Sequence, residues 1–143
     1  MNVLLRGLTE RTAATSPDAD DHRLRGRTYT IPFEGVWQAS LRVIRGKLRG
    51  WTVVLDDDRS GRIDALHRTP FRSRETEVTI TIGLDENGQT RMDATTSART
   101  ERGDWGRGRR LIGRFTRALD RELNAGPGQI LDSASVARAR ESA

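Results

Sequence analysis

Apolar residues near the C-terminal end of the chain recur with the period of an α-helix. Between residues 107 and 123 they fall on one side, which comprises Leu111, Ile112, Phe115, Leu119 and Leu123. The opposite side carries four arginines, Arg110, Arg114, Arg117 and Arg121. This pattern predicts a long amphipathic helix that packs on a hydrophobic core through its apolar side.

A second helical stripe covers residues 34–48. Its apolar positions are spaced by four, three and four residues and comprise Trp37, Leu41, Ile44 and Leu48. Gly50 follows as a stop signal. The preceding segment, residues 27–33, alternates with Tyr29, Ile31 and Phe33 on one side, which predicts a first strand that ends near Pro32.

Period-two alternation predicts two antiparallel hairpins between the helices. The inward positions of the first, on either side of a turn at residues 56–61, are Trp51, Val53, Leu55, Ile63, Ala65 and His67. The inward positions of the second, on either side of a turn at residues 85–88, are Val78, Ile80, Ile82, Leu84, Met92, Ala94 and Thr96. Its strands are expected at residues 75–84 and 90–99.

The predicted order is strand, helix, four antiparallel strands and long C-terminal helix, which makes an α+β fold. Both helices need a face to bury against, so the simplest packing is a curved sheet with the long helix across it, a helix-grip arrangement. The inward side chains of the sheet could line a pocket for an apolar small molecule. A filled core is the expectation for so small a domain.

The chain has 143 residues, which is the size of one domain. Only 34% of the residues are hydrophobic and 31% are charged, so the core must be small. We therefore expect a polar flexible leader over residues 1–25, a single domain over 26–125, and a polar tail over 126–143 that begins where Gly126, Pro127 and Gly128 stop the helix.

The absence of cysteine excludes thiol catalysis, disulfides and thiolate metal sites. The apolar run at Val3, Leu4 and Leu5 is too short for a signal peptide or a membrane span, so a cytoplasmic location is expected. His22 and His67 stand at no metal-ligand spacing, and we predict neither a metal nor another cofactor.

The formal net charge is +5, and 20 acidic residues are interspersed with the basic ones. Lys47 is the single lysine beside 24 arginines, a bias that either GC-rich coding or selection for phosphate contacts would produce. Because the arginines are spread over the chain, coding bias is the favoured interpretation and the charge alone gives little support for nucleic-acid binding.

From Tyr29 to Leu119 the residues resemble the bacterial family called domain of unknown function 1499. The resemblance rests on Val36-Trp37, Trp51 to Val53, Gly61 to Ala65, and the segment from Thr96 to Phe115 with its aspartate, following glycine, arginines and phenylalanine. Gly103 and Gly108 depart from the family pattern, which has serine and asparagine there. The resemblance implies a fold and no particular activity.

The start of the long helix holds the candidate binding residues, which are Arg102, Asp104, Arg107, Arg109, Arg110 and Arg114. Arginines beside free backbone amides could hold a phosphate or another anion, although a solvated face is the alternative. Asp104 is expected as the helix N-cap, the alternative being a functional carboxylate. The arginine row could also lie on nucleic acid or an anionic membrane.

No motif supports catalysis, since nucleophile elbows, phosphate-binding loops and paired carboxylates are missing. Asp56, Asp57 and Asp58 are expected in a hairpin turn, because the acidic ligand that closes an EF-hand is lacking. His67 is expected to be structural. The sequence thus favours a non-enzymatic module that binds a ligand or partner, and the alternative is an anion-surface binder that uses the arginine face.

Overall fold

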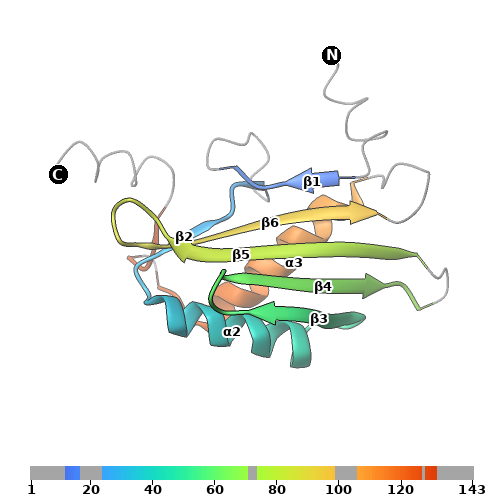
Figure 1. Ribbon diagram of the computed structural model, residues 1–143, viewed down its shortest axis with the longest axis horizontal. Helices are drawn as coiled ribbons and strands as arrows, with labels where there is room; N and C mark the ends of the chain where they lie inside the picture. The colour runs from blue at the N-terminus through green and yellow to red at the C-terminus, as the bar shows by residue number, and fades with distance from the viewer. Residues whose placement is uncertain (1–11, 17–23, 71–73, 99–105, 127, 132–143) are drawn as a thin grey trace, which may run out of the picture.

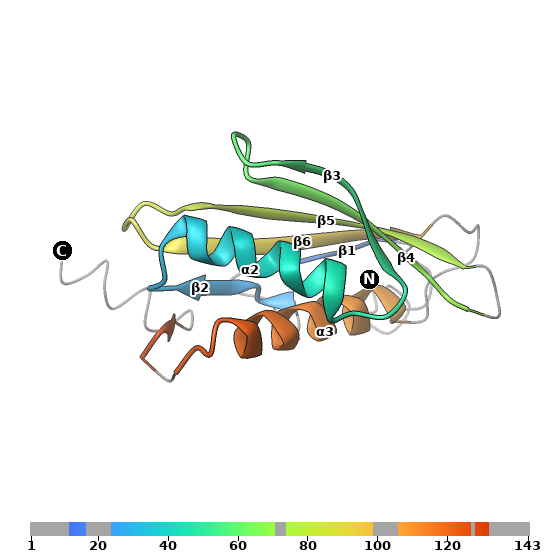
Figure 2. The same cartoon turned by 90° about the horizontal axis from the view of Figure 1, so that it is seen from below.

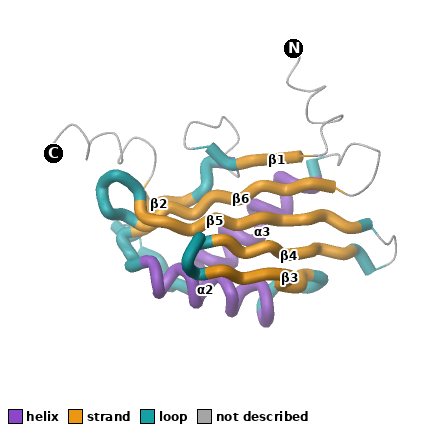
Figure 3. The backbone as a smooth tube through the Cα atoms, in the orientation of Figure 1, coloured by secondary structure: helices purple, strands orange, loops and turns teal. Residues whose placement is uncertain are grey.

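A computed structural model describes residues 12–16, 24–70, 74–98, 106–126 and 128–131. The elements in these ranges are β1 (Thr12–Ala14), β2 (Arg27–Tyr29), α2 (Phe33–Gly46), β3 (Trp51–Asp57), β4 (Arg62–Arg68), β5 (Glu75–Leu84), β6 (Thr90–Ala98), α3 (Arg107–Glu122) and β7 (Ile130–Leu131). Figures 1 and 3 show the strands side by side in one sheet, and every pairing within it is antiparallel.

The sheet has the order β3-β4-β5-β6-β2-β7, and β1 pairs with β6 beside β2. The predicted α+β class and the run of four antiparallel strands between two helices are confirmed. The sequence did not predict β1 or β7, which lie within the segments interpreted as leader and tail. Strand β1 has three residues and β7 has two, which is too few to show the alternation of apolar and polar residues. Both strands form because they pair with strands distant in the sequence.

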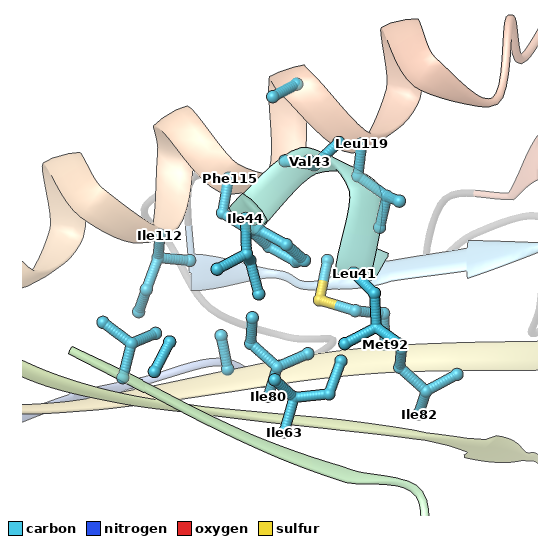
Figure 4. Packing of buried hydrophobic residues seen from close by; sticks show 14 of the residues in the cluster. Leu41, Val43, Ile44, Ile63, Ile80, Ile82, Met92, Ile112, Phe115 and Leu119 are labelled. Atoms are coloured by element: carbon cyan, nitrogen blue, oxygen red, sulfur yellow. The ribbon is translucent and has the colours of Figure 1, made fainter. Parts of the chain in front are cut away.

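Both helices lie on the same face of the sheet and run antiparallel to each other (Figure 2). Figure 4 shows their apolar side chains meeting those of the sheet, with Ile112, Phe115 and Leu119 contributed by α3. Phe115, Ile112 and Leu119 are fully buried, and Phe115 stacks on Trp51 with 6.2 Å between ring centroids. Side chains therefore fill the space between the sheet and helix α3 in this region.

Two predicted inward residues are exposed instead. Leu55 is 46% exposed because the register of β3 shifts between Val53 and Leu55. This β-bulge places Leu55 opposite Asp64, on the outer face of the sheet, since a one-residue slip reverses the direction of every following side chain. Leu84 is 66% exposed because β5 continues past Arg62, the first residue of β4.

The predicted boundaries need three corrections. Strand β2 ends at Tyr29, and Phe33 opens helix α2 behind Pro32, whose missing N–H cannot extend a ladder. Helix α3 ends at Glu122, before Gly126, because Asn124 adopts a positive φ of 50° that turns the chain. Strand β3 includes Asp56 and Asp57, so the hairpin turn is shorter than predicted.

A polar contact fixes the C-terminal half of α3 to the sheet. The Tyr29 hydroxyl donates a hydrogen bond to Asp120 Oδ1, and Arg27 Nε donates to Asp120 Oδ2 at 3.1 Å. Burial of Tyr29, together with the neighbouring Asp120 carboxylate, raises the pKa of the phenol, which stays protonated as the donor. Asp120 is thereby oriented from two sides, and α3 is held at a fixed position on β2.

Candidate functional site

The outward side of α3 is a row of arginines, as the sequence predicts. Arg110, Arg114, Arg117 and Arg121 are all exposed, whereas the opposite side of the helix is buried in the core. At 1.5 Å of rise per residue the row is about 16 Å long. We call these four residues the arginine row.

The arginine row has no acidic partner among the residues that the structure describes. Six arginines elsewhere each lie within 4.0 Å of a carboxylate, namely Arg27, Arg42, Arg45, Arg62, Arg68 and Arg91. None of the four residues in the row forms such a pair within the described ranges. Arg49 and Arg59 are likewise exposed without an ion pair in the described ranges, but only α3 aligns four such arginines on one helix face.

Arg107, at the start of α3, contacts the sheet. Its Nη2 lies 2.9 Å from Nδ1 of His67 on β4, and it donates to the Arg74 carbonyl at 3.4 Å. Because a guanidinium can only donate, Nδ1 of His67 is the acceptor and the ring proton resides on Nε2. Arg107 therefore ties the helix start to the sheet.

His67 is a buried structural histidine, in agreement with its predicted inward position. It is 7% exposed, and its ring lies edge-on to Trp51. Burial and the nearby charges of Arg107 and Arg114 lower its pKa to about 4. His67 is consequently neutral at physiological pH, which is the state that accepts the hydrogen bond from Arg107.

The described residues of the anion site predicted at the helix start lie in different surroundings. Arg107 faces His67, Arg109 is half-buried, and Arg110 and Arg114 belong to the outward row. Arg102 and Asp104 lie outside the described residues. The N-cap position is held by Gly106 with a φ of 80°, two residues after the predicted cap, so glycine's freedom at positive φ opens this helix.

Asp56 and Asp57, beside the hairpin turn, make contacts that stabilise the turn and connect it to α2. Asp57 Oδ1 accepts the Arg59 amide at 3.1 Å, and Asp57 Oδ2 accepts the Ser60 hydroxyl at 3.0 Å. Asp56 lies 3.8 Å from Arg45 on α2. Across the described ranges, His, Asp and Glu side chains form no group of three that could hold a metal ion.

Sequence reasoning missed a groove between Lys47, the residue that follows α2, and the C-terminal part of α3. It is lined by Lys47, Ala118, Arg121 and Glu122 and has a volume of about 290 Å³. The groove joins residues more than 70 positions apart, so no local pattern marks it. The one available signal is that Lys47, the sole lysine, stands just after α2 and off its apolar stripe.

Comparison of the sequence with family models and with curated proteins finds no match. The resemblance to the domain of unknown function 1499 family therefore stays a prediction. Among the described helices, neither has the length and apolar character needed to cross a membrane.

Proposed function

We propose that this protein is a non-enzymatic binding module that contacts the phosphate backbone of nucleic acid through the arginine row of α3. The observation that carries the proposal is the alignment of four unpaired arginines on the exposed face of one helix. The four residues of the row are exposed without an acidic partner in the described ranges, while six arginines elsewhere are paired.

The geometry of the row suits a repeating anion. Each strand of a nucleic-acid duplex presents a phosphate about every 3.4 Å along the axis, so a row of about 16 Å can meet several phosphates at once. Guanidinium groups bind two phosphate oxygens in parallel, which favours arginine for this contact. Rigid placement of α3 on the core reduces the entropy lost on binding.

An anionic membrane is less suited to this helix. Interfacial helices bury an apolar face among the lipids. In α3 that face, which includes Leu111, Phe115 and Leu119, is already buried against the sheet. Only charge would remain to hold the protein on a bilayer, and we therefore favour nucleic acid.

The packing of the interior favours a filled core over a pocket for an apolar small molecule. The residues proposed to line an apolar pocket, such as Tyr29, Ile80 and Met92, are fully buried in the core cluster. We propose that they serve to hold α3 in place. We also propose that the sheet with α3 across it is a variant of the helix-grip arrangement, in line with the resemblance to the domain of unknown function 1499 family.

Fluorescence anisotropy with a labelled 20-base-pair DNA duplex tests the proposal. The variant R110Q/R114Q/R117Q is compared with R59Q/R62Q/R68Q, which removes the same charge from the hairpin turn and the outer face of β4. We expect the first to weaken binding about tenfold or more and the second about twofold. Equal losses, or binding to phosphatidylglycerol vesicles but not to the duplex, would overturn the proposal.

A further inference from the structure

The groove between the two helices continues the arginine row. Arg121 is both the last residue of the row and part of the groove wall, and Lys47 stands on the opposite wall at the end of α2. Ala118 is 6% exposed, and its small side chain leaves the hollow between the two cations open. Figure 2 shows the end of α2 lying beside α3, and Lys47 of the first segment lines the same groove as Ala118 and Arg121 of the second.

The groove is cationic despite the presence of Glu122. Its Oε1 accepts a hydrogen bond from Arg42 Nε at 2.9 Å, so this carboxylate already has a cationic partner. Lys47 and Arg121 are exposed and form no ion pair in the described ranges. Two positive charges therefore remain in the groove for an external anion.

The two cations differ in the contacts that they offer. Arg121 presents a planar fork that matches two oxygens of one group, and Lys47 presents a compact charge on a flexible chain. A tetrahedral phosphate directs oxygens toward both walls of a groove, whereas a planar carboxylate directs both of its oxygens to one side. The pair is therefore suited to a phosphate held between the helices.

We infer that this groove seats one phosphate of the bound nucleic acid, an inference that rests on the function proposed above. The remaining arginines of the row then contact neighbouring phosphates along the same backbone. The groove thereby selects a phosphodiester chain over an acidic polypeptide of similar charge, because only the former supplies the tetrahedral group.

The test uses a matched pair of charge changes. K47Q removes the cation that lines the groove, and R49Q removes an exposed cation two residues away that is not among the groove's lining residues. Anisotropy is measured with the DNA duplex and with labelled polyglutamate. We expect K47Q to weaken duplex binding about fivefold or more and R49Q about twofold, since only the first removes a direct charged contact.

A third variant, A118L, fills the groove without altering the charge. We expect it to weaken duplex binding as K47Q does, with unfolding in urea used to verify that it folds. If K47Q and R49Q have equal effects, or if polyglutamate binds as tightly as the duplex, the groove inference is wrong while the arginine row can still be the binding surface. If the duplex does not bind the wild-type protein at all, both proposals fail.

Discussion

Protonation of His67 should destabilise the fold in a defined pH range. In the folded protein its Nδ1 accepts a hydrogen bond from Arg107, and burial lowers its pKa from 6.5 to about 4. His67 therefore binds a proton more tightly in the unfolded chain than in the folded protein. Stability contributed by neutral His67 is fully present above about pH 6.5 and is lost as the pH falls toward 4.

The size of this effect follows from the two pKa values. Since one pH unit corresponds to 1.36 kcal/mol, the difference between 6.5 and about 4 corresponds to about 3 kcal/mol. Below about pH 4 the loss levels off, because His67 is then protonated in both states.

Urea unfolding of the wild type and of H67Q between pH 7.5 and pH 4 measures the effect. Carboxylates titrate in both proteins, so the difference between their free energies of unfolding isolates His67. We expect the wild-type advantage to shrink by about 3 kcal/mol across this range. A difference that stays constant with pH would refute the assignment of His67 as a buried neutral acceptor.

Urea unfolding of further variants tests the two buried threonines and the turn at Gly61. Thr96 Oγ1 is buried and has no hydrogen-bond partner among the described residues, whereas Thr90 Oγ1 donates to the Ile31 carbonyl at 2.6 Å. T96V should therefore stabilise the fold by about 1 kcal/mol, and T90V should destabilise it by about the same amount. Destabilisation by T96V would mean that its hydroxyl has a partner. Gly61 has a φ of 70°, and a Cβ there would lie 2.0 Å from the Ile82 carbonyl oxygen, so G61A should cost at least about 2 kcal/mol. The control G46A adds a methyl in open space within helix α2 and should stabilise by about 0.5–1 kcal/mol; equal effects of the two changes would contradict the described turn at Gly61.

The faces of both helices could be predicted because they depend on local spacing. The four outward arginines and the buried set around Phe115 follow from the period of 3.6 residues alone. The inward positions of β4 and β6 follow in the same way from a period of two. Prediction failed at Leu55 because a bulge interrupts that period, and the amino-acid types give no sign of it.

The candidate site was less predictable because it depends on tertiary contacts. Arg107 and Arg110 are three residues apart and chemically identical, yet one contacts His67 and the other faces outward. The partners of Arg62 and Arg91 stand two residues away, whereas the contact of Arg42 with Glu122 joins residues distant in the sequence and cannot be predicted from a local pattern. The groove between α2 and α3 likewise exists only once the helices are packed together.

The salt dependence of duplex binding shows whether the arginine row of α3 contacts the phosphates. Each arginine that neutralises a phosphate of duplex DNA contributes about −0.9 to the slope of log K against log salt concentration. Substitution of three residues of the row in R110Q/R114Q/R117Q should therefore make the slope about 2.7 less negative than that of the wild type. The R59Q/R62Q/R68Q control should leave the slope unchanged. Identical slopes for the wild type and the row variant would contradict the claim that α3 is the binding surface.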